Sequence, residues 1–208
     1  MFGLKMRLMI GDYFRGRIFV VALVLILFIM GIVFGVLAAN VLEKDQRADL
    51  LDYVDQGIHG NQYTETNNYA RQTITANIQT VFFLFFMGIS VIGVPLALLL
   101  VFTRGFILGF SVGFLFQTMG FKGLILSLTG ILPHNLLVIP GLLLMVVAII
   151  DCAAALTKIR FTKKQVPIAE EFIRCAVLTM IVLIIMVLAG LVQGYITPVF
   201  TAWISKII

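Results

Sequence analysis

Five apolar stretches, each long enough to cross a lipid bilayer as a helix, limit the fold of this chain more than any other feature. The hydrocarbon core of a bilayer requires about 20 apolar residues in helical conformation. A soluble core cannot cover several such stretches. The composition agrees, because 61% of the 208 residues are hydrophobic and only 12% are charged, against about half and about a quarter in soluble domains. The sequence therefore predicts an all-α integral membrane protein with a single membrane domain over residues 1–208.

The boundaries of the expected helices follow from the limits of the apolar stretches. Pro95 lies within the second stretch and is expected to kink it, which membranes tolerate because neighbouring helices can satisfy the freed carbonyl. Gly120 and Gly123 interrupt the third stretch, which predicts a broken or tilted helix there. We expect about five transmembrane helices and one polar outer loop, at about 18–39, 78–102, 105–128, 136–156 and 172–196, with the loop at 40–77.

Leucines stand among charged residues in the first half of the outer loop, which is typical of a short amphipathic helix lying on the membrane or on a partner. Orientation follows from the basic residues near the ends of the apolar stretches, since these concentrate on the cytoplasmic side. With the N-terminus inside, ten of them are cytoplasmic (Lys5, Arg7, Arg15, Arg17, Arg104, Lys158, Arg160, Lys163, Lys164, Arg174) and five lie outside (Lys44, Arg47, Arg71, Lys122, Lys206). This bias predicts an inner N-terminus, an outer C-terminus and an odd number of crossings.

Motifs of catalysis and metal binding are missing from the sequence. There is no Walker A sequence, no H-E-x-x-H and no nucleophile elbow, and only two histidines are present. We therefore expect no enzymatic activity, no cofactor and no metal. The net charge of +5 is expected to act on anionic lipid and on orientation, not on nucleic acid. Cys152 and Cys175 are interpreted as small buried apolar residues.

Glycines repeat at intervals of four residues in three of the expected helices. Residues four apart lie on the same face of a helix, and glycine there lets two backbones approach closely. The pattern predicts close helix packing, either within the bundle or between subunits. The glycines concerned are Gly31, Gly35, Gly105, Gly109, Gly113, Gly190 and Gly194.

Pro133 and Pro140 bracket a histidine and an asparagine where the fourth helix is expected to begin. We expect Asn135 to cap this helix by accepting a hydrogen bond from a free amide of its first turn. His134 would then lie at the membrane interface, available to a partner or to titration. A structural turn and a functional contact site both remain open as interpretations of this segment.

Asp151 lies more than one turn inside the cytoplasmic end of the fourth expected helix. Ionisable groups at such depth are costly and are usually paired. Arg174, near the start of the fifth helix, has similar depth and opposite sign. We predict that Asp151 and Arg174 form an intramembrane ion pair that joins the two helices.

Three segments carry a resemblance to a known family: Asn77 with the apolar span ending in Thr103-Arg104-Gly105, the series Gly105-Phe106-Ile107-Leu108-Gly109, and Leu132-Pro133-His134-Asn135 continuing to Pro140. Together they resemble the stage II sporulation protein M family of small polytopic membrane proteins. The wider family usually has Pro-His-Gly followed by a glutamate. Here Asn135 replaces the glycine and Val138 stands near the place of the glutamate, which is similar to the sporulation branch.

The resemblance implies a multi-pass protein of the mother-cell septal membrane that is required for engulfment of the forespore. Family members act with two cell-wall hydrolases, the sporulation proteins D and P. The leading hypothesis is therefore a non-enzymatic scaffold that anchors and localises these peptidoglycan hydrolases. The alternative is a small oligomeric transporter or channel, in which Asp151, His134 and Gln193 would line a path.

Overall fold

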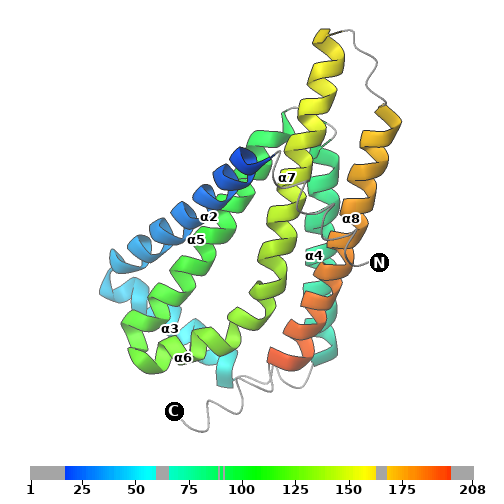
Figure 1. Ribbon diagram of the computed structural model, residues 1–208. Coiled ribbons are helices and arrows are strands. Elements are labelled where there is room, and N and C mark those ends of the chain that lie inside the picture. The colour runs from blue at the N-terminus through cyan, green and yellow to red at the C-terminus, as the bar shows by residue number, and fades with distance from the viewer. Residues whose placement is uncertain (1–16, 60–65, 89, 91, 163–167, 198–208) are drawn as a thin grey trace.

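Helices account for almost the whole described part of the computed structural model, which covers residues 17–59, 66–88, 90, 92–162 and 168–197. Figure 1 shows the long helices packed side by side as a bundle. Of these, α2, α5, α7 and α8 contain segments long and apolar enough to cross a membrane. The predicted all-α membrane fold is confirmed. The elements in order are α2 (Ile18–Asn40), α3 (Lys44–His59), α4 (Thr66–Gly88), α5 (Gly93–Met119), α6 (Phe121–Gly130), α7 (Leu132–Thr162), α8 (Ile168–Leu191) and the π-helical turn η2 (Val192–Ile196).

The bundle contains one more long helix, α4, which has the length of a membrane span but a polar first half. Figure 1 shows that α2, α4, α5, α7 and α8 alternate in direction along the bundle. Four helices thus have both the length and the apolar composition that a membrane crossing requires. The helix α4 has the length but not the composition, and it fits the alternation of directions in the bundle. The predicted outer loop 40–77 is largely helical, because α3 and the first half of α4 lie within it.

The predicted boundary between the second and third helices is wrong. Instead of ending near residue 102, the chain breaks earlier, between the end of α4 at Gly88 and the start of α5 at Gly93. The chain can reverse tightly there only because residue 93 is glycine. A Cβ at this position would collide with the carbonyl oxygen of Met87. Pro95 consequently lies in the first turn of α5, where its missing N–H has no helical partner to lose, and does not kink a span.

At its other end, α5 stops at Gly120, close to where the sequence predicts an interruption. Gly120 has a φ of 61°, in the left-handed region that favours glycine, and its N–H donates to the carbonyl oxygen of Phe116 at 2.8 Å. The short apolar helix α6 follows and leads into α7. Residues 93–119 therefore form one continuous helix, and the Thr103-Arg104-Gly105 segment lies in its middle, not at a membrane boundary.

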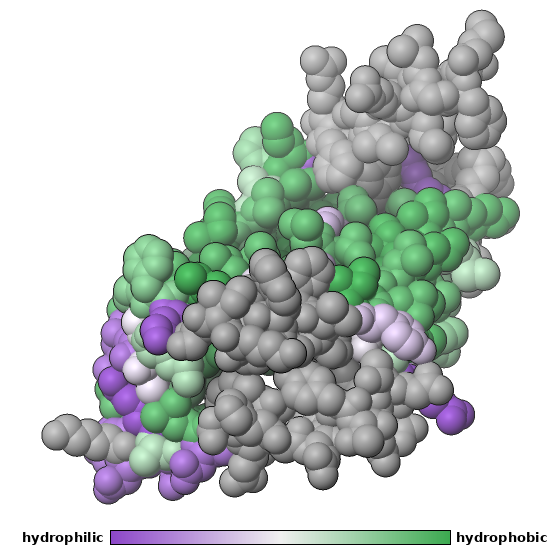
Figure 2. Space-filling view, turned by 90° about the horizontal axis from the view of Figure 1, so that it is seen from below, coloured by the Kyte–Doolittle hydropathy of each residue, from purple (hydrophilic) through white to green (hydrophobic). Residues whose placement is uncertain are grey.

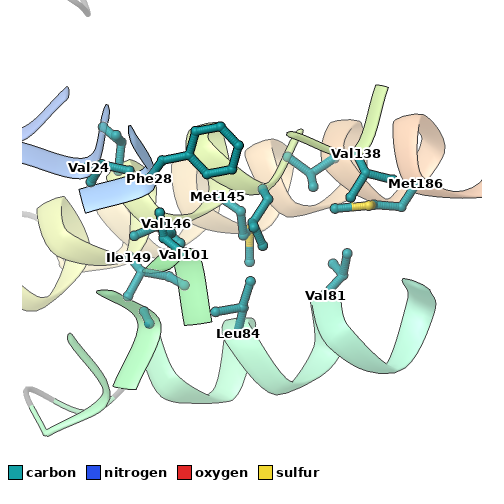
Figure 3. Packing of buried hydrophobic residues seen from close by; sticks show 14 of the residues in the cluster. Val24, Phe28, Val81, Leu84, Val101, Val138, Met145, Val146, Ile149 and Met186 are labelled. Carbon is teal, nitrogen blue, oxygen red and sulfur yellow. The ribbon is translucent and has the colours of Figure 1, made fainter. Parts of the chain in front are cut away.

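The core is formed by all five long helices, and Figure 3 shows side chains of several of them meeting. Val24 of α2, Leu84 of α4, Val101 of α5, Met145 of α7 and Met186 of α8 are each no more than 1% exposed. Large apolar side chains also cover the outside, as a lipid-facing surface requires. In Figure 2, hydrophilic side chains gather at the side of the bundle where α3 lies.

Some predicted orientation signals lie outside the described residues. These are the basic residues that precede Arg17, together with Lys163, Lys164 and Lys206. The predicted orientation, with the N-terminus inside and the C-terminus outside, stays a prediction.

Candidate functional site

The first close contact in the bundle is a glycine seam between α2 and α5. A Cβ at Gly109 would collide with the backbone of Ile32, lying 2.8 Å from its Cα. At Gly113 the approach is slightly wider, with 3.2 Å to the Cα of Val36. A Cβ does not tolerate a contact under 3.0 Å, so the seam requires glycine at Gly109, and at Gly113 a Cβ would fit only if Val36 moved slightly. We call it the α2–α5 seam, and it consists of Gly31, Gly35, Gly105, Gly109 and Gly113.

A second seam joins α8 and its π-helical turn to α4. A Cβ at Gly190 would lie 3.1 Å from the Cα of Ile74, and one at Gly194 would lie 2.7 Å from the Cα of Ala70. The seven glycines selected from the sequence thus all lie against neighbouring helices of the same chain. Of the two interpretations left open, packing within the bundle is the one that the structure contains.

Next to this second seam, two polar side chains from different helices bind the backbone of α8. Asn77 of α4 is 3% exposed, and its Nδ2 donates to the carbonyl oxygen of Met186 at 3.0 Å. His134 of α7 is 9% exposed, and its Nδ1 lies 2.9 Å from the carbonyl oxygen of Ala189. A carbonyl only accepts, so Nδ1 carries the proton and donates. These bonds hold α4 and α7 to one face of α8, since their acceptors are three residues apart.

His134 therefore does not lie free at the membrane interface, as the sequence predicted, but is buried in a contact between helices. Its position changes because α7 begins at Leu132, four residues earlier than expected. Pro133 fits this earlier start, since the first turn of a helix has unpaired N–H groups in any case.

Asn135 is consequently inside α7 and not at its N-cap, so the predicted capping role is wrong. Its side-chain Nδ2 donates to the carbonyl oxygen of Ile131 at 2.8 Å, across the junction of α6 and α7. Asn135 thus supplies a donor where the chain turns from one helix to the next. Pro140 lies within α7 and is exposed.

Asp151 of α7 forms an ion pair with Arg17, the residue that precedes α2. The two side chains are 16% and 22% exposed, so water screens the pair only partly. The pair links the start of α2 to α7. The partner predicted for Asp151 from the sequence was Arg174, which is exposed near the start of α8. That pairing stays a prediction.

Arg104 is the residue that sequence reasoning misplaced most. It was expected to end a helix at the cytoplasmic side, but it is the twelfth residue of the 27 in α5. At about 1.5 Å per residue it lies about 17 Å from one end of α5 and about 22 Å from the other. It is half-buried and within electrostatic range of His134. One sequence signal could have indicated that the helix continues through Arg104, namely the uninterrupted apolar pattern on both sides of it.

Four helices long and apolar enough to span a bilayer make this chain a multi-pass helical membrane protein. Its glycine seams and buried side-chain bonds hold these helices to one another. The chain matches the stage II sporulation protein M family over residues 24–198. It belongs to that family. It is also similar to an uncharacterized protein of Methanocaldococcus jannaschii, with 30% identity over 179 residues that cover 86% of this chain and 93% of the relative. No solved structure shows a significant match.

Proposed function

We propose that this protein is a non-enzymatic scaffold that anchors and localises peptidoglycan hydrolases at the mother-cell septal membrane for engulfment of the forespore. Membership of the family supports a sporulation membrane protein. The partners in this proposal are the two cell-wall hydrolases that the family resemblance implies, the sporulation proteins D and P.

The observation that carries the proposal is the placement of α3 at one end of the bundle. Leu50 and Leu51 of α3 pack against a small core cluster formed by Ala39, Phe114 and Leu115. α3 therefore rests on the ends of α2 and α5 and is held there by burial of apolar surface. A helix anchored in this way offers its opposite face to proteins outside the membrane.

The opposite face of α3 is acidic. Asp45, Asp49 and Asp52 are exposed, and their spacing of four and three residues places them along one stripe. With the predicted orientation, this stripe faces the cell-wall side. A row of carboxylates steers and orients basic partner surfaces more than it adds raw affinity. We therefore propose α3 as the surface that recruits the extracellular part of a hydrolase.

The contacts of the intramembrane polar residues favour a scaffold over a transporter. Asp151 is engaged by Arg17 and His134 by the backbone of α8, so two of the three residues suggested for a path serve helix contacts. Gln193, the third, accepts a hydrogen bond from Thr197 one turn away. The glycine seams support the same choice, but they bind helices of this chain and not a partner.

The proposal is tested by purifying the tagged full chain from gently solubilised sporulating cells and identifying the proteins that accompany it. We expect both hydrolases to be recovered with the wild type and to be lost, at equal scaffold yield, when Asp45, Asp49 and Asp52 are all changed to Asn. The matched control is the same triple change to Glu, which conserves charge and should retain both.

Undiminished recovery of the hydrolases with the Asn variant would refute the role of α3. Recovery of only the protein itself, as a discrete oligomer, would instead favour the transporter. Flux of ions or solutes into proteoliposomes, abolished by Asp151→Asn, would then be the expected property.

A further inference from the structure

Arg104 is an ionic group without a counter-ion in the part of the chain that the structure describes. Among the residues that the structure describes, none forms a hydrogen bond or an ion pair with its guanidinium. Asp151 is the only acidic residue between positions 66 and 162, and residues 18–42 and 172–208 contain none. Since Asp151 is paired with Arg17, the membrane-spanning helices leave no carboxylate for Arg104.

A charged guanidinium in this position carries a large free-energy cost of desolvation. It lies near the middle of α5, about 17 Å from the nearer end, too far for the side chain to extend to the water interface. Ionisable residues at such depth are usually paired and usually functional. The neighbouring His134 cannot serve as the counter-ion of Arg104, because a protonated histidine would also be positively charged.

The polar atoms nevertheless remain accessible. No fully buried side-chain nitrogen or oxygen of the described residues lacks a hydrogen-bond partner. The guanidinium nitrogens of Arg104, which have no such partner, therefore reach the surface. The same holds for Nε2 of His134, since its Nδ1 is the atom that binds Ala189. Arg104 and His134 thus present free polar atoms at neighbouring places on α5 and α7.

The surface next to Arg104 faces lipid. Along α5, Leu96, Leu99, Thr103 and Ile107 are all exposed, and their spacing of three and four residues makes one stripe. Arg104 adjoins this stripe, so a helix lying along it would bring a side chain beside the guanidinium. A lipid headgroup would stay near the interface, about 15 Å away from this depth. The depth and the apolar stripe therefore favour a transmembrane helix over a headgroup as the occupant.

We propose that Arg104, beside His134, is a docking site for a partner's transmembrane helix that carries one carboxylate near its middle. The planar guanidinium donates two parallel hydrogen bonds to the carboxylate, and the apolar part of the partner helix packs along the stripe of Leu96, Leu99, Thr103 and Ile107. The nature of the partner rests on the proposed scaffold function, in which a hydrolase anchored in the membrane by a helix would supply this segment. The intramembrane site itself does not depend on α3.

The test uses the purified full chain in phosphatidylcholine vesicles and a synthetic poly-leucine transmembrane peptide with a single central Glu. Association is measured by energy transfer between labels on the protein and the peptide, at mildly alkaline pH so that the carboxyl ionises beside the guanidinium. We expect the Glu peptide to associate about tenfold more strongly than the same peptide with Gln. Arg104→Gln should abolish this discrimination, and Ile184→Val, a change at an exposed position of α8 outside the stripe, should preserve it.

A second variant keeps the positive charge and changes its geometry. Arg104→Lys should weaken the preference and not abolish it, because the charge remains but the two-pronged geometry is lost.

Three results would overturn the proposal: equal binding of both peptides by the wild type, discrimination that persists in Arg104→Gln, or loss of discrimination when phosphatidylglycerol is added to the vesicles. The last would identify a lipid phosphate as the occupant of Arg104. Because the assay contains no hydrolase, failure of the scaffold proposal in cells and failure of this site in vesicles are separate outcomes.

Discussion

Replacement of Gly109 by Ala is expected to destabilise the bundle, although alanine is the better helix former. A Cβ at this position would lie 2.8 Å from the Cα of Ile32, about 1 Å inside ordinary carbon–carbon contact. The obstacle is backbone, so no rotamer change can relieve it. The helices α2 and α5 must move apart, and the close packing of the whole seam is loosened.

The size of the effect follows from the contacts that are lost. If the α2–α5 seam holds roughly 40 atom pairs worth about 0.15 kcal/mol each, a gap of about 1 Å forfeits a quarter to a half of about 6 kcal/mol. The loss is then about 1.5–3 kcal/mol. Alanine returns up to about 1 kcal/mol of helix propensity. The net destabilisation is about 0.5–2 kcal/mol, or a fall of about 1–8 °C in melting temperature for a chain of this size.

Matched controls come from two other buried glycines. At Gly141 in α7 a Cβ would meet the Cγ2 of Ile185 at 3.4 Å, an ordinary contact with a side chain. Gly141→Ala should be neutral or slightly stabilising. Gly113→Ala should be intermediate, because the nearest atom is the Cα of Val36 at 3.2 Å.

The assay is thermal unfolding in mild detergent, monitored through the reaction of a maleimide dye with Cys152 and Cys175. Both thiols are buried in the folded protein, so labelling reports opening of the bundle. The melting temperature is expected to be highest for Gly141→Ala, intermediate for Gly113→Ala and lowest for Gly109→Ala. Equal melting of Gly109→Ala and Gly141→Ala would refute the reasoning that backbone contact across the seam stabilises the fold.

Two further predictions use the same assay. Asp151→Asn should lower stability by about 1–2 kcal/mol, because Arg17 loses its partner. Arg17→Gln with Asp151→Asn should be less harmful than the sum of the two single changes, and a similar coupling with Arg174→Gln would show that Arg174 shares the carboxylate. Asn77→Ala and His134→Ala should each cost about 1 kcal/mol by removing a bond to α8. Wild-type stability in both variants would show that these bonds do not hold the helices together.

Sequence reasoning was most successful where the physical cause is local. Apolar runs near 20 residues require a membrane and a helix, because unpaired backbone groups are too costly in lipid. The family resemblance rested on Asn77, His134 and the glycine series, and the chain does match that family. Glycines spaced by four residues predicted close helix contact in the same way, since they share a face of any helix.

The boundaries of the middle helices could not be predicted from local pattern. Residues 78–128 are apolar almost throughout, so a break at either Arg104 or Gly93 satisfies the hydropathy. Arg104 was taken as an end because charges usually mark the interface. The collision that a Cβ at Gly93 would make with the carbonyl of Met87 decides the matter, and that contact exists only once α4 and α5 have packed.

By itself the sequence determined the environment of this protein, its helical class, its family and which residue types approach closely. Tertiary structure decided the partners: Arg17 for Asp151, the carbonyl of Ala189 for His134, and α2 for the glycines of α5. The physical reason is that periodicity specifies the face of a helix but not the helix it meets. In a bundle of five long helices, that choice depends on backbone approach and on the few polar atoms that must find a partner.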